Sequence, residues 1–184
     1  LAELAGFGGA GEASHMIIPS SDPEPAAAGI ERGLDDAGVN ADEVDYINAH
    51  ATSTPVGDRA ESRSLQLALG EAVKETPVSS TKSMTGHLLS AAAAVEALAC
   101  ITAIQRQTLP ATINLDRPDP ECDLLHVAGQ SRPAKVRVAA STSFGSGGGW
   151  PASSSCVGGS SNTPVRLKAS IASSKDPNCV ESAL

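Results

Sequence analysis

Residues 44–70 read VDYINAHATSTPVGDRAESRSLQLALG, and this stretch decides the fold class. Residues 44–49 alternate in the way that a half-buried strand does. A polar turn follows over 50–55, and a helix is predicted from about 58 to 69 because Gly70 is a natural helix end. A strand that leads through a short turn into a helix is the repeating unit of α/β proteins.

The same alternation extends on both sides of this stretch. Residues 1–20 predict a strand and a loop, and SDPE at 21–24 has the pattern of a helix capping box with Pro in the first turn. The predicted helix that follows ends at Gly38, and its apolar face consists of Ala26, Ile30, Leu34 and Ala37. Further strands are predicted at 77–81, 108–113, 123–127 and 135–143.

A long Ala-rich helix is predicted after His87, reaching Ile104. It is apolar nearly all round, so we expect it to be buried, with Glu96 as an isolated charge. Strands and helices alternate through 21–149, which predicts a layered α/β domain.

The character of the sequence changes after Gly149. Residues 150–184 are rich in Ser, contain Pro151, Pro164 and Pro177, and show no hydrophobic period. We therefore expect a folded domain over 1–149 and a Ser-rich tail over 150–184 that is disordered or non-native.

Composition narrows the class of protein. Apolar residues make up 41% of the 184 residues, enough for a globular core. The net charge is −8 without a clustered basic face, so we expect no nucleic-acid partner. No run of 18 apolar residues is present, so we expect no membrane span. The four cysteines, Cys100, Cys122, Cys156 and Cys179, match no CxxC spacing, so we expect free thiols and no metal site.

Two histidines stand where catalytic groups gather in α/β proteins, at strand ends and helix starts. His50 follows the strand over 44–49, and His87 precedes the Ala-rich helix. A neutral imidazole at such a place can donate Nε2–H to a developing oxyanion. The alternative is that each histidine caps a turn or packs in the core.

Lys82 and a glycine-rich turn are further candidates. If Lys82 is buried, it needs a carboxylate partner, and Asp58, Glu61 and Glu96 are available; otherwise it is an exposed loop lysine. FGSGGG at 144–149 follows a strand and could bring backbone N–H groups to an oxyanion, or it could be a flexible linker. The turn lacks the P-loop and GxGxxG spacings, so nucleotide binding is weakly supported.

Four segments together resemble a known family, the elongating β-ketoacyl-acyl-carrier-protein (ACP) synthases. NAHATSTPVGD at 48–58 is similar to the family's NAHGTSTPxGD, and SSTKSMTGHLL at 79–89 is similar to SSTKSMTGHLLG. The stretch over 110–124 resembles PPTINL…NPD…CDL, and SFGSGG at 143–148 resembles the end of NSFGFGG. The resemblance covers roughly residues 1–148.

The resemblance implies the C-terminal half of a thiolase-like α/β/α/β/α fold and a decarboxylative Claisen condensation. In that reaction malonyl-ACP loses carbon dioxide, and the resulting carbanion attacks an acyl chain held on a cysteine thioester. His50 and His87 would stabilise the enolate, and Lys82 would hold the network around His87. Phe144 would supply a backbone N–H to the oxyanion hole and gate the nucleophile. Supporting roles would fall to Asp58, Glu61, Glu96, Thr52 and Thr54.

The chain also departs from the family pattern. Ala51 stands for the usual Gly, Thr142 for the usual Asn and Ser146 for the second Phe. The family's TN-x-x-L-I-F strand after Gly148 is absent, and we expect that WPAS at 150–153 cannot replace it, because Pro cannot pair in a central strand. The family's nucleophilic cysteine lies in the other half, and we expect none of the four cysteines here to replace it, so the isolated chain is expected to be inactive.

Three functions therefore stand side by side: part of a fatty-acid elongating synthase, a polyketide synthase ketosynthase domain, or a non-catalytic partner subunit. The resemblance implies malonyl- and acyl-ACP as partners, a homodimer in the full-length enzyme and no cofactor. The first residues, LAEL, lack a starting Met, so we expect that the chain begins within a longer protein. Bacterial cytoplasm, a plastid or a mitochondrion would each fit, and any targeting segment would precede this chain.

Overall fold

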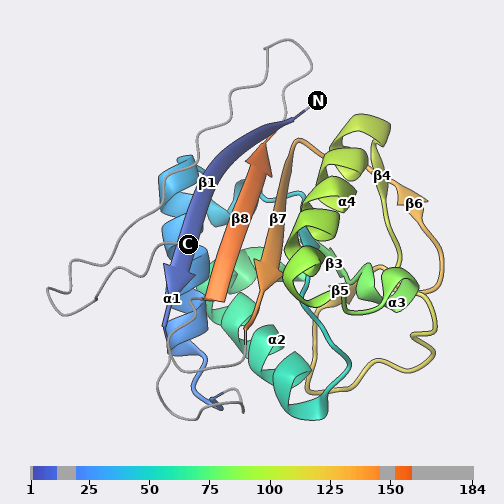
Figure 1. Cartoon of the computed structure of the whole chain (residues 1–184), viewed down its shortest axis with the longest axis horizontal. Helices are drawn as coiled ribbons and strands as arrows, with labels where there is room; N and C mark the ends of the chain where they lie inside the picture. The colour runs from blue at the N-terminus through green and yellow to red at the C-terminus, as the bar shows by residue number, and fades with distance from the viewer. Residues whose placement is uncertain (1, 12–19, 146–151, 159–184) are drawn as a thin grey trace, which may run out of the picture.

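The computed structural model describes residues 2–11, 20–145 and 152–158, which form a sheet with helices on both faces (Figure 1). In chain order the elements are β1 (Glu3–Ala10), α1 (Glu24–Ala37), η1 (Ala41–Glu43), β2 (Tyr46–Asn48), α2 (Pro55–Leu69), η2 (Gly70–Lys74), β3 (Pro77–Ser79), α3 (Lys82–Thr85), η3 (Leu89–Ala91), α4 (Ala92–Arg106), β4 (Thr108–Leu109), β5 (Leu125–His126), β6 (Arg132–Pro133), β7 (Val138–Ser143) and β8 (Ala152–Gly158), where η marks a 3₁₀ helix.

The main sheet has the strand order β1-β8-β7-β2-β3-β5. Strands β7, β2, β3 and β5 run parallel, whereas β8 lies antiparallel between β1 and β7. Strands β4 and β6 form a separate antiparallel pair. Helix α4 covers one face of the main sheet, and α1 and α2 cover the other (Figure 1). The predicted layered α/β fold is confirmed.

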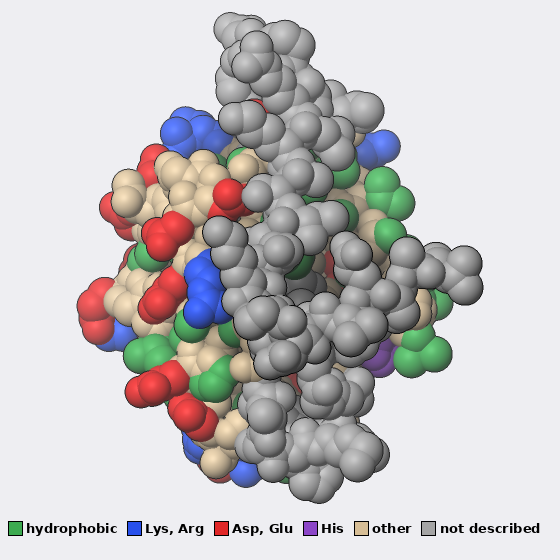
Figure 2. Space-filling model, turned by 60° about the vertical axis from the view of Figure 1, so that its left-hand side comes forward, with side chains coloured by type: hydrophobic (Ala, Val, Ile, Leu, Met, Phe, Trp, Pro, Cys, Tyr) green, Lys and Arg blue, Asp and Glu red, His purple; other side chains and the backbone are tan. Residues whose placement is uncertain are grey.

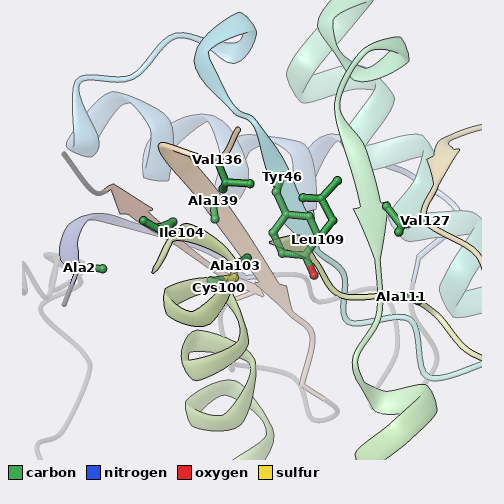
Figure 3. Close-up of a cluster of buried hydrophobic side chains, with 10 residues drawn as sticks. All are labelled: Ala2, Tyr46, Cys100, Ala103, Ile104, Leu109, Ala111, Val127, Val136 and Ala139. Carbon is green, nitrogen blue, oxygen red and sulfur yellow. The ribbon is translucent and has the colours of Figure 1, made fainter. Parts of the chain in front are cut away.

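Two hydrophobic cores fill the spaces on either side of the sheet. Tyr46 and Ala139 face α4, where they meet Cys100 (Figure 3). Ile47 and Ala140, the next residues along the same strands, belong to the core against α1 and α2. Successive side chains of a strand point to opposite faces, so one strand supplies both cores.

Strand β1 lies against the backbone of α1. A Cβ added at Gly8 would lie 2.2 Å from the carbonyl oxygen of Gly29 and 2.2 Å from the nitrogen of Gly33. Because backbone atoms cannot yield as a flexible side chain can, only glycine fits at this position.

The start of α1 differs from the prediction. Its C-terminal end is as expected, because Gly38 adopts a φ of 64° and caps the helix. The predicted capping box at 21–24 is wrong, since no side chain caps Pro23 at the N-cap position. Instead, the Asp22 carboxylate accepts the N–H of Glu24, and the Ser20 hydroxyl accepts the N–H of Asp22.

The Ala-rich helix is not buried all round, and that prediction is wrong. Helix α4 begins only at Ala92, and it buries one stripe that includes Glu96 and Cys100. The side chain of Leu98 on the opposite stripe is 61% exposed, and Leu89, just before the helix, is 75% exposed.

One helical stretch in the described residues, Leu89–Arg106, is long and apolar enough to cross a membrane by length and composition alone. This differs from the expectation of no span. The core helix of a soluble protein passes the same test, and the buried stripe of α4 packs on the main sheet.

The C-terminal region also departs from expectation. Residues 152–158 form β8 between β1 and β7, so the predicted tail over 150–184 is wrong for this segment. The ladder begins at Ala152, and a proline that precedes a strand removes none of its hydrogen bonds. Residues 159–184 lie outside the described residues.

All five strands predicted between residues 44 and 143 are shorter than expected, and those at 44–49 and 77–81 are β2 and β3. The strand predicted at 108–113 is the short β4, and those at 123–127 and 135–143 are β5 and β7.

On the face of the molecule in Figure 2, acidic and basic side chains are interspersed.

Candidate active site

His50 and His87 come together at the ends of neighbouring strands. His50 follows β2, and His87 lies between α3 and η3, beyond the end of β3. Their ring centroids are 5.3 Å apart with the ring planes at 88°. The ring of Phe144, which follows β7, lies 5.7 Å from that of His50. Parallel strands that end at one edge of a sheet gather such residues.

Hydrogen bonding defines the tautomer of the His87 ring. The backbone N–H of Leu89 donates to Nδ1 of His87 over 3.3 Å. Because Nδ1 is the acceptor, the neutral imidazole carries its proton on Nε2. This is the tautomer that can donate from Nε2 to an oxyanion.

His50 is held neutral by its surroundings. Burial lowers its pKa to about 4, and the positive charge of Lys82 acts in the same direction. At neutral pH the His50 imidazole is therefore uncharged and can both donate and accept a hydrogen bond.

Lys82 is buried and paired with Glu96. The ammonium group of Lys82, at the start of α3, contacts the carboxylate of Glu96 on α4, and both side chains are at most 5% exposed. The hydroxyl of Ser143 donates to the other carboxylate oxygen of Glu96 over 3.2 Å. Of the three carboxylates considered from the sequence, Glu96 is thus the one that pairs with Lys82.

Glu61 serves the His50 turn instead. Its carboxylate accepts the backbone N–H groups of His50 and Ala51, each over 2.8 Å, and the hydroxyl of Thr142 over 2.5 Å. Burial raises the pKa of Glu61, and these three hydrogen bonds oppose the increase.

Thr52 and Thr54 belong to the same turn, and Asp58 follows them in the first turn of α2. Burial raises the pKa of Asp58, against hydrogen bonds from the backbone of Thr54 and Ser53. The hydroxyls of Thr52 and Thr54 are 3.4 Å apart. Thr54 is the N-cap residue of α2, although its side chain makes no cap hydrogen bond.

A cavity of about 580 Å³ adjoins these side chains. It is lined by residues 51–55 and Asp58, by Lys82 and His87, and by part of the segment over 112–126. The described residues include no group of three His, Cys, Asp or Glu side chains that could hold a metal ion.

Two of the four cysteines have described side chains. Cys100 is in the middle of α4, where its thiol donates to the carbonyl of Ala140. Cys122 is a half-buried free thiol in a loop, and burial raises its pKa, which disfavours the nucleophilic thiolate. Neither lies at the start of a helix.

Sequence reasoning missed the residues that connect the site. Thr142 and Ser143 stand in the sequence only as parts of a motif, and no hydrogen-bonding role was predicted for either. Asn48 is fully buried and donates from Nδ2 to the Thr81 hydroxyl over 3.1 Å. All are at or next to the ends of β2, β3 and β7, so the strand order was the signal that could have found them.

Comparison with known proteins assigns the family. Residues 1–116 match the model for "Beta-ketoacyl synthase, C-terminal domain". The chain belongs to the β-ketoacyl synthase family. This confirms the resemblance read from the four sequence segments.

Curated members of the family align with most of this chain. The 3-oxoacyl-[acyl-carrier-protein] synthase 2 of Synechocystis sp. is 48% identical over 146 residues, which are 79% of this chain and 35% of that protein. The protein of the same name from Coxiella burnetii is 46% identical over 147 residues, 80% of this chain and 36% of its own length. The chain thus spans about a third of the length of these relatives.

Solved structures of the family share the fold. A β-ketoacyl synthase from Burkholderia phymatum STM815 matches with a TM-score of 0.79 and 34% identity, over 86% of this chain and 38% of its own. The ishigamide ketosynthase/chain length factor matches with a TM-score of 0.80 and 34% identity, over 86% of this chain and 38% of its own. The predicted C-terminal part of a thiolase-like fold is therefore confirmed.

Proposed function

We propose that this chain is the histidine- and lysine-bearing part of a 3-oxoacyl-ACP synthase that elongates fatty acids. The observation that carries the proposal is the pair of rings His50 and His87, 5.3 Å apart beside the cavity, with the buried Lys82–Glu96 pair close by. The neutral state of His50 and the Nε2–H tautomer of His87 support it.

The reaction needs donors for a transient negative charge. When malonyl-ACP decarboxylates, the bond to the carboxylate carbon breaks and its electron pair moves into an enolate. Nε2–H groups of His50 and His87 stabilise the enolate oxygen as that charge develops. The α-carbon then attacks the acyl thioester, a carbon–carbon bond forms and the cysteine leaves as a thiolate.

The nucleophilic cysteine is not assigned to Cys100 or Cys122, for the reasons of position given above. We propose that it belongs to the part of a full-length synthase that this chain does not span. ACP with malonyl and acyl groups is the proposed partner, and a homodimer is the proposed assembly. The relatives named as acyl-carrier-protein synthases support the first of these.

A polyketide ketosynthase is the second candidate. It is favoured by the structural match to a type II polyketide ketosynthase in complex with its acyl-carrier protein, at 36% identity and a TM-score of 0.81. The higher identity to the synthases named above and the sequence TST at 52–54 favour fatty-acid elongation.

A chimera tests the proposal. Residues 1–158 of this chain would replace the matching third of the Synechocystis relative, with His50→Ala and His87→Ala as variants. We expect the parent chimera to release carbon dioxide from malonyl-ACP, and each variant to do so about 10²–10³-fold more slowly. Acyl transfer to cysteine needs no malonyl enolate and serves as the internal control. Release at the parental rate in both variants would overturn the assignment, and a folded but inactive parent would favour a non-catalytic subunit.

A further inference from the structure

Thr142 is a buried polar residue near the end of β7. In the parallel ladder, Ser141 of β7 lies beside Asn48 of β2. Thr142 therefore stands beside the point at which the chain leaves β2 and turns into His50. Its side chain is 2% exposed, so its hydroxyl depends on the protein for hydrogen bonds.

The hydroxyl of Thr142 has two partners, the carboxylate of Glu61 and the backbone N–H of His50. It donates to Oε1 of Glu61 over 2.5 Å and accepts the backbone N–H of His50 over 3.3 Å. Glu61 is on α2, so these contacts join a strand, a helix and the catalytic turn. A hydrogen bond to a buried carboxylate is among the stronger kinds in proteins.

The turn that these contacts hold is strained. Ala51 has a φ of 26° and Ser53 a φ of 65°, and residues other than glycine rarely adopt such positive values. Such backbone persists only where surrounding contacts fix it. The Glu61 carboxylate does so by accepting the N–H groups of His50 and Ala51.

We propose that Thr142 is a positioning residue: its hydroxyl fixes the Glu61 carboxylate under the strained turn and so holds His50 toward His87. Thr142 acts through Glu61 and the backbone of His50, without touching the reacting groups. The proposal rests on the function proposed for His50, yet its test needs no catalysis.

Two variants of the whole 184-residue chain distinguish the effect of the Thr142 hydroxyl from that of its methyl group. Thr142→Val keeps the branched shape and removes the hydroxyl, whereas Thr142→Ser keeps the hydroxyl and removes the methyl. The readouts are hydrogen exchange of the His50 and Ala51 amides and the titration of the His50 ring, both by NMR. The amide of Val39, which donates to Leu34 in α1, is the control for global unfolding.

In Thr142→Val we expect the His50 and Ala51 amides to exchange about 10- to 100-fold faster, because a buried bond to a charged group is lost. The titration of His50 should move toward that of an exposed histidine, and the Val39 amide should stay as in the parent. In Thr142→Ser the exchange of the His50, Ala51 and Val39 amides and the titration of His50 should stay near those of the parent.

The proposal is overturned if folded Thr142→Val exchanges and titrates like the parent. It is equally overturned if Thr142→Ser loosens the turn, because packing of the methyl group would then be the cause. The Ser variant gives this answer even if the Val variant fails to fold. Neither result depends on turnover, so failure here leaves the proposed reaction standing.

Discussion

Replacing Glu96 with Gln should destabilise the chain strongly, because it leaves the ammonium group of Lys82 buried without a carboxylate. The two side chains are 5% and 2% exposed, so water cannot take the place of the missing partner. Removing one member of a buried ion pair costs about 3–5 kcal/mol. Each 1.36 kcal/mol is a factor of ten, so the folding equilibrium should fall by between about two and four orders of magnitude.

The double variant Lys82→Met/Glu96→Gln completes the test. With the charge on Lys82 also removed, the desolvation penalty disappears, and replacing a buried pair by uncharged groups is often close to neutral. We therefore expect the double variant to be more stable than Glu96→Gln alone. Urea denaturation of the whole chain, monitored by circular dichroism, measures the free energies of unfolding of the parent, of Glu96→Gln and of the double variant.

A surface pair of the same chemistry provides the control. Lys74 and Glu71 form an ion pair with side chains 68% and 89% exposed. Glu71→Gln should leave the unfolding midpoint unchanged, because exposed pairs contribute little. The buried ion pair does not act in this way if Glu96→Gln is as mild as Glu71→Gln, or if the double variant is no more stable than Glu96→Gln.

Other predictions concern the backbone, the pH and the activity. Ala51→Gly should raise the thermal midpoint or leave it unchanged, since Ala51 has a φ of 26°, whereas Gly38→Ala should lower stability by about 1 kcal/mol, since Gly38 has a φ of 64°. Gly8→Ala should lower stability by at least about 1–3 kcal/mol in a denaturant titration, since its Cβ would overlap the α1 backbone. As the pH falls from 6.5 to about 4, the unfolded chain protonates His50 before the folded chain does, so the parent should lose stability relative to His50→Gln; a constant difference would contradict the lowered pKa. The purified chain should form no 3-oxoacyl-ACP from malonyl- and acyl-ACP, and sustained product formation detected by mass spectrometry would show that a group of this chain serves as the nucleophile.

Much of the fold could be predicted from local pattern, and the failures share a cause. In the stretch over 44–70, β2 and α2 could be predicted because the apolar residues change from a period of two to a helical period at a polar turn. The pattern could not show that one stripe of α4 is exposed, since periodicity reports apolar character and not what packs on it. It also missed β8, because ASSSCVG has no apolar alternation and gains its order from pairing with β1 and β7.

The types of the site residues could be predicted from the sequence, whereas their hydrogen-bond and ion-pair partners depend on the fold. His50 and His87 could be named from their positions after strands, and the structure brings their rings together. The choice of Glu96 over Asp58 and Glu61 as the partner of Lys82 could not be made in advance, since it depends on how α4 crosses the sheet. Thr142 shows the limit most clearly, because only the register of β7 beside β2 places it under the His50 turn.

The carboxylates of Glu96 and Glu61 have different effects on the two histidines of the site. Glu96 balances the charge of Lys82, so a cation can stay buried near His50 and help to lower its pKa. Glu61 makes no ion pair in the described part of the chain, and its carboxylate accepts hydrogen bonds from two backbone N–H groups and the Thr142 hydroxyl. One carboxylate thus controls the electrostatics and the other the geometry. Exchanging Glu61 for Gln should therefore loosen the His50 turn, whereas exchanging Glu96 for Gln should act through the unpaired ammonium group.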